Sequence, residues 1–126
     1  MITRITIKSE PVLGSLNKSG KDRLTITRTS VRYEYEPLMP SERNPADRWT
    51  GTCNDEKFES MFHNLCAEVG EIMSRSEDYS GAEHDLTTFT VMYDDGKREE
   101  RTFQVPDEAF AVCFTIVDQM VKRARG

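Results

Sequence analysis

Residues 89–105, FTVMYDDGKREERTFQV, decide the fold class because they contain two strand patterns joined by a short turn. A two-residue turn would leave the apolar side chains of the two strands on opposite faces of the hairpin. A three-residue loop at 94–96, with Gly96 in the left-handed conformation of a β-bulge, instead pairs Tyr93 with Lys97. This register predicts an antiparallel hairpin with one apolar face, formed by Phe89, Val91, Phe103 and Val105.

A helix is predicted directly after this hairpin. Pro106 suits the first helical position, and Asp107 and Glu108 follow in the first turn, where negative charge is favoured by the helix dipole. Basic residues stand near the other end of this helix: Lys122, Arg123 and Arg125. The apolar residues recur at helical spacing and predict one buried stripe, formed by Phe110, Cys113, Phe114, Val117, Met120 and Val121.

A longer helix is predicted over 55–75, because its apolar residues fall within about 120° of arc. This stripe consists of Phe58, Phe62, Leu65, Cys66, Val69, Ile72 and Met73. Asp55 and Glu56 stand in the first turn, and we expect Asn54 or Thr52 to be the N-cap. The residues that follow, 76–85, are rich in acidic side chains and predict a loop.

Strand patterns crowd the first third of the chain. Isoleucines alternate with polar residues over 3–8, and two further segments with strand character follow, 24–27 and 31–35. The apolar positions change from even to odd numbers between these two segments. We therefore predict a hairpin turn around 28–30, which keeps both sets of side chains on one face.

Residues 36–48 contain three prolines and predict a surface loop, which a short strand over 48–53 follows. The predicted order is therefore β-β-β-(β)-α-β-β-α. Runs of strands followed by helices predict an α+β fold, with a mostly antiparallel sheet of about five or six strands and two helices packed on one face. A chain of 126 residues without internal repeats predicts a single domain, 1–126.

Charge is divided unevenly along the chain, whose net charge is -5. Residues 1–50 carry nine Lys and Arg against six Asp and Glu, whereas residues 51–126 carry eight against sixteen. In one interpretation, a basic sheet face and acidic helices stabilise each other and keep the protein soluble. In the other, one charged surface docks a partner of opposite sign. The acidic surplus disfavours a general nucleic-acid binder, which needs Lys and Arg to displace the counterions of phosphates.

Hydropathy and cysteine usage favour a cytoplasmic protein. The mean hydropathy is -0.63, and no apolar run approaches the roughly 18 residues of a membrane span, so we expect no membrane association. Cys53, Cys66 and Cys113 form an odd set without a CxxC pair. Cys66 and Cys113 fall on the predicted apolar stripes, where a free cysteine usually acts as a small hydrophobic residue.

The sequence contains two histidines, His63 and His84, as candidate bases for a nucleophile. His63 falls at the border of the apolar stripe of the 55–75 helix, where we expect it to be partly exposed and not catalytic. Glu83, His84 and Asp85 are the candidate metal ligands. Because their spacing matches neither an EF-hand loop nor HExxH, a solvated acidic loop is the favoured interpretation, and we expect no cofactor.

The candidate binding residues are the arginines and aromatic residues of the predicted sheet, namely Arg28, Arg32, Tyr33, Tyr35 and Trp49. These residue types dominate binding hot spots, and an antiparallel sheet often leaves one face open. A packing role competes with this hypothesis, because Tyr33 and Tyr35 share the parity of Val31 and are expected to point into the core with it.

Three functions remain open from the sequence. The leading hypothesis is a non-catalytic module that binds another macromolecule, a protein of unknown identity, through its sheet face or the 36–50 loop. The second is a small-molecule or metal-dependent enzyme with a pocket between sheet and helices and with residues 83–85 as its polar groups. The third is an acidic inhibitor, similar to an antitoxin, whose carboxylates occupy a basic groove on its target. Association into a homo-oligomer also stays open.

Overall fold

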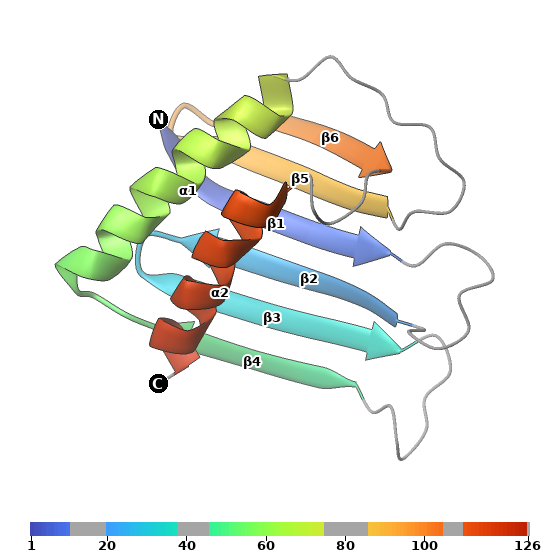
Figure 1. Cartoon of the computed structure of the whole chain (residues 1–126), viewed down its shortest axis with the longest axis horizontal. Coiled ribbons are helices and arrows are strands. Elements are labelled where there is room, and N and C mark those ends of the chain that lie inside the picture. The colour runs from blue at the N-terminus through green and yellow to red at the C-terminus, as the bar shows by residue number, and fades with distance from the viewer. Residues whose placement is uncertain (11–19, 38–45, 75–85, 105–109, 126) are drawn as a thin grey trace.

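In the part of the chain that the structure describes, six strands and two helices follow one another in the order that the sequence predicts (Figure 1). The computed structural model describes residues 1–10, 20–37, 46–74, 86–104 and 110–125. Its elements are β1 (Ile2–Glu10), β2 (Gly20–Thr27), β3 (Ser30–Pro37), β4 (Asp47–Thr52), α1 (Glu56–Ser74), β5 (Leu86–Tyr93), β6 (Arg98–Gln104) and α2 (Ala111–Arg125).

The strands form one sheet in the order β4-β3-β2-β1-β5-β6, and every neighbouring pair is antiparallel. β1 therefore lies in the interior of the sheet, where Ile5 is opposite Ile26 of β2 on one side and Val91 of β5 on the other. Both helices lie across the same face of the sheet (Figure 1). The predicted α+β fold, with an antiparallel sheet and two helices on one face, is confirmed.

The hairpin of β5 and β6 has the predicted three-residue loop. The Tyr93 N–H donates to the carbonyl of Lys97 at 2.9 Å, and the Gly96 N–H donates to the carbonyl of Tyr93 at 3.1 Å. Gly96 has a φ of 88°, which is the left-handed conformation that glycine adopts without a steric penalty. The resulting register places Phe89, Val91 and Phe103 on the same face; Val105, the fourth residue of this prediction, lies outside the described residues.

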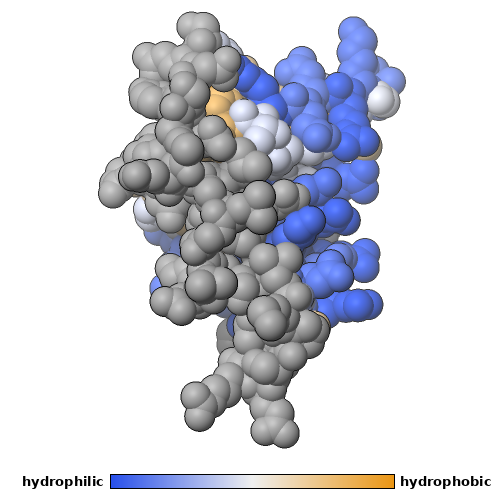
Figure 2. Space-filling model, turned by 90° about the vertical axis from the view of Figure 1, so that its right-hand side faces the viewer, coloured by the Kyte–Doolittle hydropathy of each residue, from blue (hydrophilic) through white to orange (hydrophobic). Residues whose placement is uncertain are grey.

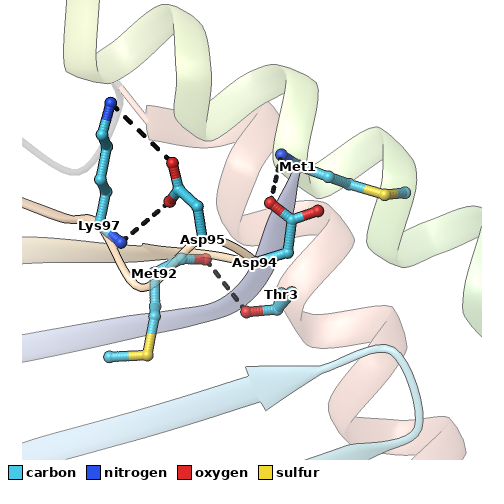
Figure 3. A network of polar contacts seen from close by, with 6 residues as sticks. All are labelled: Met1, Thr3, Met92, Asp94, Asp95 and Lys97. Atoms are coloured by element: carbon cyan, nitrogen blue, oxygen red, sulfur yellow. Dashed lines mark hydrogen bonds and ion pairs between the residues drawn. The ribbon is translucent and has the colours of Figure 1, made fainter.

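The start of β1 is tied to this turn (Figure 3). The Asp94 N–H donates to the carbonyl of Met1 at 2.9 Å, and the terminal ammonium of Met1 lies 3.3 Å from Oδ1 of Asp94. The Thr3 hydroxyl donates to the carbonyl of Met92 at 3.3 Å. The turn therefore holds the central strand in its register with β5.

The change of parity between β2 and β3 is explained by the predicted turn. Ile26 is paired with Val31, and two residues, 28–29, connect the strands. The hydroxyls of Thr27 and Ser30 lie 2.7 Å apart at the base of this turn. Even positions on β2 and odd positions on β3 consequently share one face.

The predicted loop over 36–48 is wrong at both of its ends. β3 continues to Pro37, and β4 begins at Asp47; residues 38–45 lie outside the described part of the chain. The last pair between β3 and β4 joins Tyr35 to Asp47. Pro37 therefore lies beyond the last residue pair between β3 and β4. Its lack of an N–H group costs no hydrogen bond with β4 there.

The core lies between the sheet and the two predicted helical stripes. Phe89 of β5, Phe103 of β6 and Phe110 at the start of α2 form an edge-to-face cluster, with ring centroids 5.3 to 5.9 Å apart. The other buried residues of the stripes are Phe58, Phe62, Leu65, Val69 and Ile72 on α1 and Cys113, Val117 and Met120 on α2. Neither of the two described helices is long and apolar enough to cross a membrane.

The N-cap of α1 is Asp55, so the prediction of Asn54 or Thr52 is wrong. The helix begins at Glu56, and Oδ1 of Asp55 accepts the Phe58 N–H at 2.7 Å. The other carboxylate oxygen, Oδ2, lies 2.9 Å from Nε of Arg123 near the end of α2. One side chain therefore caps α1 and ties it to α2. Residues 106–108, predicted to open the second helix, lie outside the described residues.

Gly51 allows the end of α2 to approach β4 closely. A Cβ atom at this position would come within 2.7 Å of the backbone carbonyl carbon of Ala124.

We expect Gly51→Ala to lower the free energy of unfolding by about 1 to 3 kcal/mol, because a rigid backbone must move. Gly70→Ala is the matched control, since nothing lies within 4 Å of its added methyl. It should raise stability by about 0.5 to 1 kcal/mol. Urea unfolding measures both, and an unchanged midpoint for Gly51→Ala would contradict the close approach.

Asp55 should make stability depend on pH in the acidic range. Its hydrogen bond from the Phe58 N–H and its contact with Arg123 hold the pKa of the carboxyl below its ordinary value of 3.8. A lowered pKa stabilises the folded state above pH 3.8, and this contribution is lost as the pH falls through the folded pKa. Asp55→Asn should therefore lower the melting temperature at neutral pH, with a difference from wild type that shrinks in acid. A difference independent of pH would contradict the ionic contact.

Candidate functional site

The side of the sheet away from the helices carries polar side chains, and we call it the exposed face. On β1, Arg4, Thr6 and Lys8 point to this side, because they alternate with Ile5 and Ile7, which are only 0% and 2% exposed on the helix side. Figure 2 shows hydrophilic residues along this side of the molecule, at the right of the picture. The face spans all six strands.

The exposed face is basic although the chain as a whole is acidic. Among the side chains that the structure describes, alternation places seven basic residues on it: Arg4, Lys8, Lys21, Arg23, Arg32, Arg48 and Arg98. It places three acidic residues there: Glu34, Glu36 and Glu100. This local surplus of positive charge contrasts with the net charge of -5 for the whole chain.

Only one of the two described helices carries a net charge opposite to that of the exposed face. α1 carries four glutamates, Glu56, Glu59, Glu68 and Glu71, against Lys57, and is acidic. The described residues of α2 carry Asp118 against three basic residues near its end, Lys122, Arg123 and Arg125. The expectation of a basic sheet face with acidic helices therefore holds for α1 and not for the described part of α2.

Two ion pairs neutralise part of the exposed face. Nε of Arg32 lies 2.8 Å from Oε1 of Glu34, and Nη2 of Arg98 lies 2.8 Å from Oε2 of Glu100. Four cations of this face have no carboxylate partner within the described part of the chain: Arg4, Lys8, Arg23 and Arg48. Their charge is available to an anionic ligand.

A shallow hollow of about 310 Å³ lies in the middle of the exposed face. Three threonines line it, Thr6, Thr25 and Thr90, together with five cations, Arg4, Lys8, Arg23, Arg32 and Arg98. Glu34 and Met92 complete the lining. A second hollow, of about 710 Å³, lies beside it toward the end of the sheet and shares Lys8, Arg23 and Glu34 with the first.

Hydroxyl groups beside guanidinium and ammonium groups are suited to binding oxyanions. Charge-assisted hydrogen bonds from such donors to carboxylates or phosphates are stronger than those between neutral groups. The described side chains of this face include no histidine and no cysteine that could activate its threonine hydroxyls. The arrangement therefore supports binding.

The five predicted binding residues do not share one surface. Arg32 lies on the exposed face, whereas Tyr33 and Trp49 lie on the helix side, with ring centroids 5.9 Å apart. Tyr35 shares the side of Tyr33 by alternation. The guanidinium of Arg125 stacks over Trp49 at 5.1 Å from the ring centroid, so this side chain packs against α2.

Arg28 lies apart from the other four predicted binding residues, in the turn between β2 and β3. Its Nη1 is 3.7 Å from Oε1 of Glu59 on α1. This ion pair joins two exposed side chains and is screened by solvent. The structure therefore places Arg28 at the junction of sheet and helix.

Most of the cationic surface consists of residues that were not predicted as binding residues, namely Arg4, Lys8, Lys21, Arg23, Arg48 and Arg98. The signal that could have found them is strand alternation: each occupies the polar parity of a strand whose apolar parity faces the core. Alternation assigns residues to a face. It leaves open which strands are neighbours.

Acidic and aromatic side chains gather on the helix side of β2, β3 and β4. Burial raises the pKa of the Asp22 carboxyl, although Ser9 donates hydrogen bonds that oppose this shift. Burial, together with the nearby charges of Asp22 and Asp47, raises the pKa of Tyr33. The tyrosine stays protonated at neutral pH and contributes a neutral ring to this side of the sheet.

The predicted metal ligands Glu83, His84 and Asp85 lie outside the described residues. Within the described ranges, no group of three or more His, Cys, Asp and Glu side chains is arranged to hold a metal ion. His63 is on α1 as predicted, partly exposed, with Nε2 3.9 Å from Oε1 of Glu59.

Comparison with known proteins does not assign the exposed face a role. No protein family, no curated protein and no solved structure matches this chain. The geometry and charge of the face itself are therefore the basis for inferring its function.

The predicted packing role of the two helix cysteines is confirmed by their positions. Cys113 is buried in the core, and Cys66 is half-buried against it. Burial raises the pKa of the Cys66 thiol from 9.0 to about 11 and that of Cys113 to about 12. Both thiols are therefore poor nucleophiles at neutral pH.

Native protein at pH 8 should react slowly with iodoacetamide at both residues. The shift of the Cys66 pKa from 9.0 to about 11 implies about a hundredfold less thiolate than in the unfolded chain. Mass spectrometry of peptides from native and urea-unfolded samples measures this protection. The unfolded sample is the control, since all thiols are accessible there, and rapid native labelling of Cys113 would contradict its place in the core.

Proposed function

We propose that the protein is a non-catalytic binding module that holds an acidic segment of a protein partner on the exposed face of its sheet. The observation that carries this proposal is the concentration of basic side chains on one face of an acidic chain. The four cations of this face without a carboxylate partner in the described structure, Arg4, Lys8, Arg23 and Arg48, come from three strands, β1, β2 and β4.

The sheet supports this function by holding the cations in fixed relative positions. Arg4 and Lys8 stand on β1, which is hydrogen-bonded on both sides, so binding requires no rearrangement of the backbone that carries them. Two unit charges 4 Å apart attract by only about 1 kcal/mol in water. Several such contacts are needed, and a broad face supplies them.

A protein partner is favoured over a nucleic acid. Single-stranded nucleic acids bind to platforms on which aromatic rings stack with bases. The described side chains of the exposed face include no aromatic residue, because the rings of Tyr33, Trp49 and Phe89 are on the helix side. The net charge of -5 also opposes a long polyanion, whereas a short acidic segment interacts mainly with the local face.

The test is binding of a fluorescein-labelled polyglutamate peptide, measured by fluorescence anisotropy at low ionic strength. The double reversal Arg4→Glu/Arg23→Glu should weaken binding by at least about tenfold, because it removes two unpaired cations and adds two repulsive charges. Added salt should weaken wild-type binding as well.

Lys57→Glu/Lys97→Glu is the matched control, since it changes the net charge by the same amount away from this face, on α1 and on the β5–β6 turn. Its affinity should stay close to wild type. Melting temperatures of all variants verify folding. Equal losses in both double variants would show that only net charge matters and would refute the proposed surface, as would absence of binding by the wild type.

A further inference from the structure

Four side chains of the two interior strands β1 and β2 form a compact rectangle on the exposed face. Lys8 is opposite Arg23, and in the next pair on the same face Thr6 is opposite Thr25. Side chains directly opposite each other in such strands lie about 5 Å apart at Cβ, and the next pair on the same face is about 7 Å further along. All four line the hollow of about 310 Å³.

The pair of cations in this rectangle is unfavourable for the isolated protein. Like charges directly opposite each other in a sheet destabilise it. Glu34 faces Arg23 from β3, but its carboxylate is bound to Arg32 at 2.8 Å. Neither Lys8 nor Arg23 has an ion-pair partner among the described residues. An anion placed between them would remove the repulsion.

The two threonines add neutral donors to this site. No hydrogen bond involves the hydroxyl of Thr6 or of Thr25 within the described structure, whereas Thr88 on the same face is bonded to Thr102 at 2.9 Å. Two cations and two free hydroxyls therefore meet in one hollow. The two positive charges of this site exceed the single negative charge of one carboxylate.

We infer that this rectangle binds a phosphoryl group carried by a phosphorylated side chain of the partner protein. A phosphate monoester brings nearly two negative charges and three strong acceptor oxygens at neutral pH, which match two cations and two hydroxyl donors. The inference depends on the proposed function and makes it more specific, because it identifies one modified residue as the anchor of the acidic segment.

The surroundings of the hollow favour a phosphate on a protein over a free phosphate ion. Arg4, Arg32 and Arg98 also line it and spread the positive charge over about the width of five strands. This arrangement provides contacts for acidic residues on both sides of the modified side chain. Glu34 in the lining opposes a continuous chain of phosphates, which would pass directly over its carboxylate.

Three short fluorescein-labelled peptides of Glu and Gly test this inference, identical except for phosphoserine, aspartate or serine at the centre. The phosphoserine peptide should bind wild type about tenfold more tightly than the aspartate peptide. Lys8→Gln and Arg23→Gln should each bring this ratio close to one. Since both variants remove like-charge repulsion, their melting temperatures should equal or exceed that of wild type, which separates the effect from loss of folding.

Arg48→Gln is the control on the same face, because Arg48 is not part of the hollow of about 310 Å³. It should weaken both charged peptides by a similar factor and leave their ratio unchanged. Thr25→Val should reduce the ratio without a change of charge, which identifies the hydroxyl as a donor.

Equal affinity of wild type for the phosphoserine and aspartate peptides would refute the phosphoryl site. If polyglutamate still bound in that case, the proposed function would stand without it. If an oligonucleotide bound as tightly as the phosphopeptide and lost affinity equally in Lys8→Gln, the assignment to a protein partner would be wrong. If neither Lys8→Gln nor Arg23→Gln changed the ratio of the affinities for the phosphoserine and aspartate peptides, the phosphoryl group would bind elsewhere on the protein.

Discussion

Alternation along β1 is the constraint on which the rest of the structure depends. The strand is hydrogen-bonded to β2 and to β5, so its register determines the placement of both halves of the sheet. Ile5 and Ile7 point into the core, and Thr6 and Lys8 therefore point to the opposite side. A shift by one residue would exchange these two sets and bury charge under the helices. The bonds between the start of β1 and the 94–96 turn oppose such a shift.

The same constraint separates the stabilising part of the molecule from the part that is free to bind. The core side holds the aromatic cluster of Phe89, Phe103 and Phe110 and the thiol of Cys113. At the edge of this layer, the guanidinium of Arg101 stacks on Phe103 and donates to the carbonyl of Met73 at 2.8 Å. The sheet cations without a carboxylate partner in the described structure, Arg4, Lys8, Arg23 and Arg48, do not enter it, because burying an unpaired charge is costly. They occur on the exposed face, where water solvates them and where their replacement has little effect on packing. Stability and the proposed recognition therefore depend on different residues of the same strands.

The described residues fit the proposed binding function. The helix cysteines are protected by burial, and His63 lies at the surface of α1, with a glutamate for its neighbour and no nucleophile. The exposed face has an excess of hydrogen-bond donors, which are cationic side chains and threonine hydroxyls. The hydrogen-bonded sheet holds them in fixed positions. Two of these cations, Lys8 and Arg23, stand opposite each other without compensation inside the described chain. Such an arrangement is unfavourable in the free protein and becomes favourable when an anion is bound, which is the physical basis of the proposed partner.

The sequence by itself determined the elements and the α+β class, because the periodicity of apolar residues and the need for Gly96 in a left-handed turn are local properties. It also predicted both buried stripes and the hairpins.

Smaller errors, such as the N-cap at Asp55 and the extension of β3 to Pro37, arose because strand and helix ends depend on partners distant in sequence. The candidate site could not be predicted in the same way: the aromatic residues Tyr33 and Trp49 were grouped with Arg32 because these residue types dominate binding hot spots, although alternation and pairing put them on opposite faces. Only the tertiary structure decided that β1 lies between β2 and β5. Strand order follows from the long-range burial of both helices on one sheet. This order brings the cations of separate strands together.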